Sequence, residues 1–485
     1  MRRTRPSSIA LTIDHSSRVP MHEQIYLQVR DAVQAGVLHE GDRLPSVRLL
    51  TRDLGVSHIT VEQAYLELSV EGYVRAVPRS GYVVEHVDTA FFEAEREDVR
   101  ARVSKVVAAG TATGLVAEDQ MGSAVRFDFS YVNLRPGSFP QRAWQKACQE
   151  VSLGPGDPFE RYDYHGHTGS LQREIARYLR QARGVVCEPE QVILEPGSQA
   201  AVSELFQLFD PSSQTVGVEE PGWQVARTTA ERLGFRTVPL AVGEAGPRMA
   251  ANLREADPSI AFLTPSHQFP TGVVLPLQSR VEVLEWARER NAYVIEDDSC
   301  SEYRYDMRPV PSLQSLDTGL RTVYLGNFSK TLSPALRVAY LVLPPDLLER
   351  YLQTFPSGHP GVSTYEAEAL AQFMASGQYE RQLRRMVADN RKCHDELLRC
   401  LTDRFGDMMD IRGKHSGMHL YVTVKNGMGT DELIATALKH DAKVYSTERF
   451  WFSRPAPEGV VMLGFSALAL EDIAPAVDAL AEAWL

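Results

Sequence analysis

From about residue 125 to residue 330, short apolar runs alternate with longer stretches of helical periodicity, and this alternation limits the fold more than any other feature. Apolar runs bounded by turn residues are typical of buried strands, which we expect at 191–194, 215–218, 260–263, 292–295 and 322–325. Strands that alternate with helices predict an α/β fold with a mainly parallel central sheet. Ligand-binding groups are then expected at the carboxyl ends of the strands.

The first 85 residues follow a different pattern. Apolar residues recur at helical spacing over 21–35 and predict a first helix. Ser46 and Ser57 each precede a further helical pattern, where a serine hydroxyl can cap free backbone N–H groups. Gly55 separates these two patterns. Two short helices joined by a glycine turn predict a helix-turn-helix.

Two strand-like runs, 73–77 and 82–84, flank a turn at 78–81 and predict a wing after these helices. In a winged helix-turn-helix the third helix enters the major groove, while the second helix and the wing contact phosphates. Base contacts are therefore expected from His58, Ile59, Thr60 and Gln63. Phosphate or wing contacts are expected from Arg43, Ser46, Arg48, Arg75, Arg79 and Gly81. We predict binding to a double-stranded DNA operator, although such modules also serve in dimerisation or protein docking.

Charge distinguishes the two parts of the chain. The whole chain has a net charge of -12, which argues against a nonspecific nucleic-acid coat. Residues 1–84 contain ten arginines, no lysine and nine acidic residues, so their net charge is about +1. The net charge of the remaining residues is therefore about -13. DNA binding therefore belongs to the first segment.

A chain of 485 residues exceeds what one hydrophobic core usually serves. We assign 1–85 to a DNA-binding domain, 86–124 to a linker and 125–485 to an effector domain, with a large part at about 160–350 and a small part at about 351–485. The linker composition, charged and then rich in Ala and Gly, predicts a partly helical tether. Such a tether lets two DNA-binding heads reposition; an inert spacer is the other interpretation.

The five cysteines are scattered and lack metal-ligand or CxxC spacing. This pattern predicts reduced thiols, no metal site and a cytoplasmic location. No stretch approaches about 18 uninterrupted apolar residues, so we expect neither a signal peptide nor a membrane anchor.

Two strand ends carry an acid and an amine. A buried-type strand ends in Glu296-Asp297-Asp298, and Lys330 follows the strand expected at 322–325. Pyridoxal phosphate needs a lysine amine to form a Schiff base and a carboxylate to keep its ring nitrogen protonated. Taken singly, such a lysine is usually solvated and such acids usually cap the next element. Together, Lys330 and Asp297 predict a pyridoxal phosphate site.

A phosphate monoester also requires hydrogen-bond donors. Ser198 and Gln199 lie at the predicted start of a helix, where free backbone N–H groups bind anions. Asn327, Ser329 and Arg337 lie close to Lys330 in the sequence and add side-chain donors.

Several segments resemble known families. The N-terminal part resembles the GntR family of winged-helix regulators in Gly-Asp-Arg-Leu-Pro-Ser-Val-Arg at 41–48, in 61–65 and in Glu-Gly-Tyr at 71–73. The later part resembles fold-type I aminotransferases, and more closely the MocR group of GntR regulators, in 264–272, 295–298, 327–330 and 334–337. This resemblance covers nearly the whole chain.

The resemblance implies a winged helix-turn-helix fused to a fold-type I aminotransferase-like domain. By its motifs, Lys330 is the Schiff-base lysine, Asp297 the partner of the ring nitrogen and Arg337 a phosphate ligand. Trp223 is the aromatic residue that stacks on the cofactor ring. His267 is expected near the ring, a buried and satisfied histidine being the other interpretation. Sites of this type are commonly completed by a second subunit, so a homodimer is implied.

The sequence departs from these families at three places. His58-Ile59 stands where GntR proteins often have Arg-Asn, so the operator sequence cannot be inferred. Ser299 stands where a tyrosine usually contacts the ring oxygen of the cofactor. Met462 stands at or beside the position of the arginine that clamps a substrate carboxylate, although Arg412 or Arg454 could replace that arginine.

These departures favour a sensor over a catalyst. Without the clamp, an α-amino acid loses a charge-assisted pair worth roughly 1.5–3 kcal/mol. The sequence therefore predicts a DNA-binding regulator, not an enzyme, that senses pyridoxal phosphate or an amino compound reacting with it. An aminotransferase that carries a DNA-binding module is the alternative. A third interpretation is a DNA-bound scaffold that no longer binds the cofactor.

Overall fold

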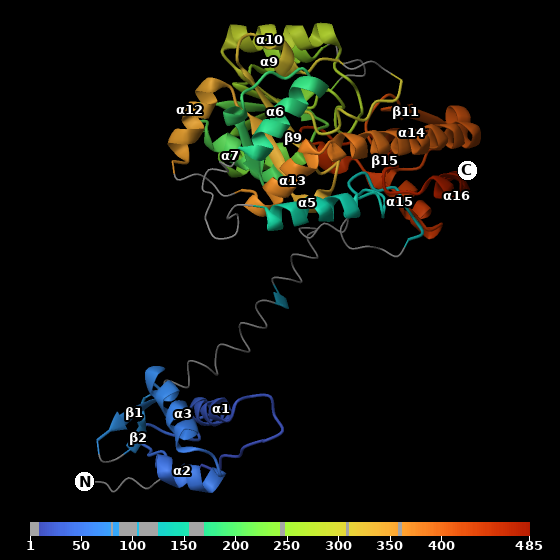
Figure 1. Ribbon diagram of the computed structural model, residues 1–485. Coiled ribbons are helices and arrows are strands. Elements are labelled where there is room, and N and C mark those ends of the chain that lie inside the picture. The colour runs from blue at the N-terminus through green and yellow to red at the C-terminus, as the bar shows by residue number, and fades with distance from the viewer. Residues whose placement is uncertain are drawn as a thin grey trace. The chain divides into compact units, whose positions relative to one another are not determined.

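The chain forms two compact units, residues 1–123 and 124–485, in a computed structural model (Figure 1). The structure describes residues 9–78, 81–86, 104–105, 125–154, 169–242, 248–306, 310–356 and 361–485. Arg79 and nearly all of the predicted linker lie outside these residues.

The first unit is a winged helix-turn-helix, as predicted. Its elements are α1 (Met21–Gln34), α2 (Val47–Leu54), α3 (His58–Val70), β1 (Val74–Val77) and β2 (Gly81–Val84). The Ser46 and Ser57 hydroxyls accept hydrogen bonds from the Leu49 and Thr60 N–H groups at 3.2 and 3.1 Å and so begin α2 and α3. Gly55, at φ 66°, ends α2 in the left-handed conformation that glycine adopts without a steric cost. The three predicted helix-boundary residues are therefore confirmed.

Tyr65 holds the third helix against the rest of this unit. The residue is fully buried beside Val29 and Val61. Its hydroxyl donates to the Pro45 carbonyl at 3.0 Å, and its ring lies 5.0 Å from that of Tyr82 in the wing. The core thus uses one face of α3 and leaves the opposite face in solvent.

The second unit is built on a seven-stranded sheet in the order β4-β10-β9-β8-β7-β5-β6. The strands are β4 (Val192–Glu195), β5 (Thr215–Glu220), β6 (Arg236–Ala241), β7 (Ile260–Leu263), β8 (Tyr293–Asp297), β9 (Thr322–Asn327) and β10 (Ala339–Val342). Neighbouring strands from β6 to β9 pair in parallel, whereas β10 pairs antiparallel with both β4 and β9. The predicted mainly parallel sheet is confirmed.

Alternate side chains of the sheet enter separate apolar layers. Tyr293 and Ile295 of β8 pack with α7 (Ser198–Gln207), α8 (Gln224–Arg232) and α12 (Pro345–Thr354). Val294 enters the other layer with α9 (Met249–Ala256) and α10 (Leu277–Arg290). That face is also covered by helices near the β4 end of the sheet: α5 (Gln141–Leu153), α6 (Ser170–Ala182) and α13 (Thr364–Ala375). The short α11 (Leu313–Leu316) follows β8. Helices on both faces explain why the strands are apolar throughout.

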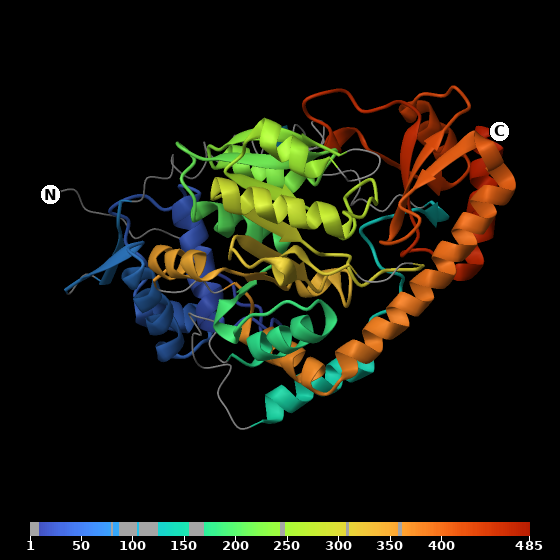
Figure 2. The same ribbon diagram turned by 90° about the horizontal axis from the view of Figure 1, so that it is seen from above.

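A smaller part follows α13 in the chain. The 28-residue helix α14 (Gln378–Phe405) runs from α13 to this smaller part as one long rod (Figure 2). The second sheet has the order β11-β12-β15-β14. The remaining elements are β11 (Met409–Arg412), β12 (His419–Val424), α15 (Thr430–Lys439), β14 (Tyr445–Ser446), β15 (Val460–Gly464) and α16 (Leu470–Trp484). A two-residue strand from the start of the unit, β3 (Phe127–Asp128), pairs with β13 (Ala442–Lys443). Throughout the described ranges, no helix has the length and apolar character needed to span a bilayer.

Candidate functional site

The direction of β10 brings distant polar groups to one edge of the large sheet. β8 ends at Asp297 and β9 ends at Asn327, both at the carboxyl edge. Because β10 is antiparallel, its first residue, Ala339, lies opposite both Glu195 and Asn327. Arg337, just before Ala339, therefore lies beside the turn after β4. Residues that the sequence predicts for one pyridoxal phosphate site therefore lie together at the carboxyl edge of the sheet.

A chain of hydrogen bonds joins the start of α7 to the end of β8. The Asn327 amide donates to the Ser198 hydroxyl at 3.0 Å and to the Ser299 hydroxyl at 2.7 Å. The Ser299 hydroxyl in turn donates to the Asp297 carboxylate, and the Ser299 N–H donates to the same oxygen at 3.1 Å. The sequence indicates Ser299 only as the replacement of a tyrosine, and its bridging role was not predicted. Its position two residues after Asp297 was the one available signal.

The predicted acid and amine both shift toward their neutral forms. Burial raises the pKa of Asp297 to about 6, against the opposing hydrogen bonds from Ser299. Burial also lowers the pKa of Lys330. The Lys330 Nζ donates to the backbone carbonyls of Tyr131 at 3.3 Å and Val132 at 2.9 Å. A lysine whose pKa is lowered carries more of the unprotonated, nucleophilic amine.

The turn between β4 and α7 has the form of an anion cradle. Gly197, at φ 97°, precedes the first residue of α7. A Cβ atom at this glycine would lie only 2.4 Å from the Arg337 Nη2. The missing side chain lets the guanidinium lie against a helix start that also offers the Ser198 hydroxyl and free N–H groups. A cation, a hydroxyl and helix N–H groups are a donor set that fits the phosphate of pyridoxal phosphate.

The other predicted cofactor residues lie at or near the same edge. Trp223 directly precedes α8, after β5, and its half-buried ring lies 5.8 Å from that of Phe262. Ser329 donates its N–H to the Asn327 side chain at 3.0 Å. Gln199 is exposed, one residue into α7.

His267 is buried, and only one of its ring nitrogens is hydrogen-bonded within the described residues. Its Nδ1 lies 3.0 Å from the Ser416 hydroxyl, whereas Nε2 has no partner there. Burial, with His419 close by, holds the pKa of His267 well below its usual value. The neighbouring Gln268 amide donates to the Pro221 carbonyl at 2.8 Å and to Glu219 at 3.3 Å, which links its loop to the end of β5.

Met462, at the expected place of the clamp, is fully buried in β15. It packs in an aromatic cluster with Tyr131, Tyr445 and Phe450. The Arg449 guanidinium donates to the Tyr131 hydroxyl and lies over the Phe450 ring at 5.2 Å. The residue predicted at or beside the clamp position is thus enclosed by aromatic side chains.

The two arginines considered as replacements have other contacts. Arg412 lies 3.8 Å from Asp410. Arg454 lies over the Trp451 ring at 4.8 Å.

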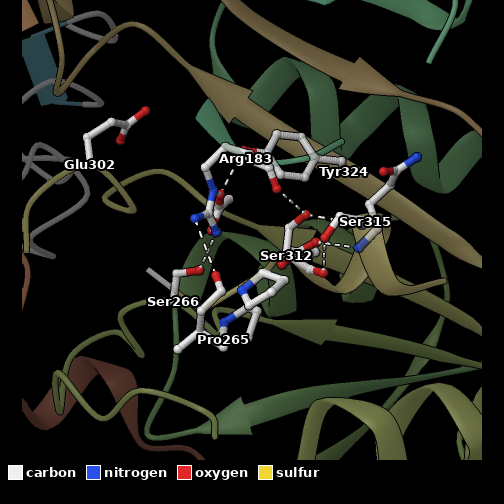
Figure 3. A network of polar contacts seen from close by, with 12 residues as sticks. Arg183, Pro265, Ser266, Glu302, Ser312, Ser315 and Tyr324 are labelled. Atoms are coloured by element: carbon white, nitrogen blue, oxygen red, sulfur yellow. Dashed lines mark hydrogen bonds and ion pairs between the residues drawn. The ribbon is translucent and has the colours of Figure 1, made fainter. Parts of the chain in front are cut away.

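Asp298, beside Asp297, belongs to a buried network that the sequence did not reveal (Figure 3). The Arg183 guanidinium donates to both oxygens of Asp298 at 2.6 and 3.1 Å and to Ser266 at 3.1 Å. The Tyr324 hydroxyl donates to Asp298 at 2.7 Å. Although burial opposes ionisation, Arg183 holds the pKa of Asp298 below its usual value. The network fixes the strand end from which Asp297 projects.

Comparisons with known proteins agree with this architecture. The model of aminotransferase class I and II matches residues 131–479, and that of bacterial regulatory proteins of the gntR family matches residues 21–84. The chain is 33% identical to the uncharacterized HTH-type transcriptional regulator YdeL of Bacillus subtilis, over 96% of this chain and 97% of the relative. It is 30% identical to the probable rhizopine catabolism regulatory protein MocR of Rhizobium meliloti, over 98% and 96% of the two chains. The chain belongs to the MocR group of GntR-family transcriptional regulators.

This MocR-type regulator is also similar to solved structures of aminotransferases. It matches the α-aminoadipate aminotransferase of Thermus thermophilus with a TM-score of 0.66 and 26% identity, over 74% of this chain and 92% of the enzyme. The fold-type I assignment is therefore confirmed.

The residues predicted to contact bases lie outside the core of the first unit. Ile59 is 73% exposed, and His58 and Gln63 are also exposed, paired with Glu62 at 3.4 Å and Glu67 at 3.2 Å. Thr60 is half-buried, because the Ser57 cap contacts it.

The predicted phosphate contacts are also exposed. They are Arg43, Ser46, Arg48, Arg75 and Gly81. Arg75 pairs with Glu85 at 2.5 Å, and Ser46 keeps its hydroxyl proton for a phosphate while its oxygen caps α2. The predicted contact residues described on α2, on α3 and in the wing are thus mostly exposed.

Proposed function

We propose that this regulator senses pyridoxal phosphate, or an amino compound that reacts with it, at Lys330 and does not act as an aminotransferase. The proposal depends on two features: hydrogen bonds join Ser198, Asn327, Ser299 and Asp297 at one sheet edge, and Met462 is buried in an aromatic cluster. Met462 is the residue predicted at or beside the position of the carboxylate clamp. Such a site keeps what is needed to hold the cofactor and lacks what positions an amino-acid substrate.

The residues at the sheet edge divide the work of holding the cofactor. Arg337, Ser198 and the start of α7 would hold the phosphate, and Trp223 would cover the ring. The Asp297 carboxylate would accept a hydrogen bond from the protonated ring nitrogen, and Lys330 would form the Schiff base. When bound, pyridoxal phosphate supplies an aldehyde for the amine and an electron-withdrawing ring.

Lys330 and Asp297 are prepared for these roles by their surroundings. Burial favours loss of the Lys330 proton, and the carbonyls of Tyr131 and Val132 hold Nζ in place. The two Ser299 hydrogen bonds oppose protonation of Asp297 and fix its orientation. A cationic ring nitrogen would further favour the charged carboxylate.

In this proposal, ligand binding at Lys330 biases the effector domain between two states. We assign 1–85 to the DNA-binding head, 86–124 to the tether and 125–485 to the effector domain. In a homodimer, a change in the effector domains then alters the spacing of two heads on paired operator sites.

The test uses the purified full-length protein with pyridoxal phosphate. Borohydride reduction followed by peptide mass spectrometry should place the label on Lys330, and Lys330→Ala should abolish it. Lys439→Ala, an exposed lysine on α15, is the matched control and should be labelled like the natural protein. Operator affinity, measured with and without the cofactor, should change in the natural protein and in the control but not in Lys330→Ala. Unchanged affinity in the natural protein would contradict the sensing role.

The alternative, an active aminotransferase, is favoured by one finding. The chain is 27% identical to a 2-aminoadipate transaminase of Thermus thermophilus over 72% of its length. Turnover of amino-acid and keto-acid pairs by the full chain, lost in Lys330→Ala, would establish this activity and overturn the sensor-only proposal.

A further inference from the structure

A cavity of about 590 Å³ lies outside the cofactor edge. It is bounded by the end of α6, the segment 301–304 that follows β8, and the middle of α14. Its size is that of a pocket for a small organic molecule. No residue assigned above to the cofactor or to DNA lines it within the described part of the chain.

The wall from α14 combines positive charge with apolar surface. Arg384, Arg391 and Lys392 are exposed on this helix. Leu383 and Val387, which line the same cavity, are half-buried. Asp389 lies 3.4 Å from Lys392 and offsets part of its charge, and the Arg391 guanidinium donates to the Arg304 carbonyl at 3.1 Å. The full positive charges of Arg384 and Arg391 therefore remain beside the apolar side chains of Leu383 and Val387.

The opposite wall contains a donor without a partner. The Arg304 Nη2 is inaccessible to solvent and has no hydrogen-bond partner among the described residues. Burial lowers the pKa of Arg304, and the positive charge of Arg183 adds to this effect. A buried cation held near another cation gains stability from an anion.

Glu302 is the one acid among the described residues that line the cavity. Its Oε1 accepts from the Tyr178 hydroxyl at 2.9 Å, and its Oε2 has no partner among the described residues. In Figure 3 its carboxylate lies apart from the network around Arg183. Burial and the charge of Asp298 raise the pKa of Glu302, which weakens its repulsion of an anion.

We infer that this cavity is a second ligand site, which binds a small organic anion with an apolar body. Arg384 and Arg391 would bind the carboxylate or phosphate group, and the buried positive charge of Arg304 would add electrostatic attraction. Leu383, Val387 and the Tyr178 ring would contact the apolar body. The inference is independent of pyridoxal phosphate binding at Lys330.

The site has a physical route to the cofactor edge. Arg183 lines the cavity, and its guanidinium binds Asp298, the neighbour of Asp297. An anion in the cavity would also be attracted by the positive charge of Arg183, and this attraction weakens the ion pair between Arg183 and Asp298. Occupancy should therefore alter the surroundings of Asp297.

Phenyl phosphate is the probe for the full-length protein, measured by isothermal titration calorimetry. Inorganic phosphate, which lacks the apolar body, and phenol, which lacks the charge, should each bind at least tenfold more weakly. Arg384→Gln and Arg391→Gln should each weaken phenyl phosphate binding about three- to tenfold, because each removes one charged donor. Both residues are exposed, so the fold should survive either change.

Arg381→Gln is the matched control. Arg381 is equally exposed on α14, three residues before Arg384, and does not line the cavity. It should leave the affinity within twofold of the natural protein. Equal affinities for Arg384→Gln, Arg391→Gln and Arg381→Gln, or no binding of phenyl phosphate, would overturn the inference.

Discussion

The DNA-binding head and the cofactor edge place their functional groups differently with respect to the core. In the head, Ile59 is 73% exposed, whereas Val61, two residues later, is fully buried. At the sheet edge, Asn327 contacts Ser198 and Ser299, and Lys330 binds the backbone of a distant segment. Substitutions in the head can therefore change recognition alone, but substitutions at the sheet edge also change the fold.

The largest effect that tests this difference is expected from Asp298→Asn. The change leaves the buried Arg183 without a carboxylate, so the second unit should lose about 3–5 kcal/mol of stability. Urea unfolding followed by tryptophan fluorescence reports on this unit alone, because all five tryptophans belong to it: Trp144, Trp223, Trp286, Trp451 and Trp484.

The control is Asp478→Asn, which breaks an exposed pair with Arg404 at 2.5 Å. Its expected cost is about 0–1 kcal/mol. Similar losses in the two variants would show that the buried network does not hold the strand end.

The next effect has the opposite sign. Asp297→Asn should stabilise the cofactor-free protein by about 3 kcal/mol at pH 7.5, because burial raises the pKa of Asp297 from 3.8 to about 6. A raised carboxyl pKa means that the folded state takes up a proton. The natural protein therefore loses this stability as pH rises from about 4 to 6. The gain of the variant should be full above pH 6 and vanish toward pH 4 in urea unfolding; a gain that does not depend on pH would contradict the assignment.

A smaller effect is expected in the head, on binding alone. Arg48→Gln removes an exposed charge on α2 and should weaken operator binding several-fold. The slope of log affinity against log salt should fall by about 1, as expected for one lost phosphate contact. Hydrogen exchange of the α3 amides, which reports on the stability of the head, should not change. An affinity loss that is the same at all salt concentrations would exclude a phosphate contact.

The smallest effect on stability is expected from Arg75→Gln in the wing. Its partner Glu85 is 37% exposed and Arg75 is 61% exposed, so the pair should contribute at most about 0.5 kcal/mol. The free energy of opening measured by hydrogen exchange of the α3 amides should fall by no more than about 0.5 kcal/mol. A clear loss of hydrogen-exchange protection would show that, in the head as at the sheet edge, a functional side chain also stabilises the fold.

Local signals made the head predictable from its sequence. Ser46, Ser57 and Gly55 mark helix ends by their own chemistry, and the observed helices begin or end beside them. Strands were also predicted at 215–218 and 292–295. The observed strands extend further, to Glu220 and Asp297, because the covering helices bury the sheet beyond the end of each apolar run.

Long-range pairing limited what could be predicted of the site. No local signal shows that β10 inserts between β4 and β9, yet this insertion brings Arg337 beside Gly197. Arg183 and Asp298 are likewise 115 positions apart. The identities of Lys330 and Asp297 could be read from strand ends, whereas their partners depend on the order of the strands.

The length of α14 gives it the mechanics of a lever. Its 28 residues span about 42 Å at 1.5 Å per residue. If the end near α13 were held, a tilt of about 5° would move the other end by about 4 Å, more than the length of a hydrogen bond. A small displacement of the arginines in its middle is therefore magnified at the second sheet, which carries Met462.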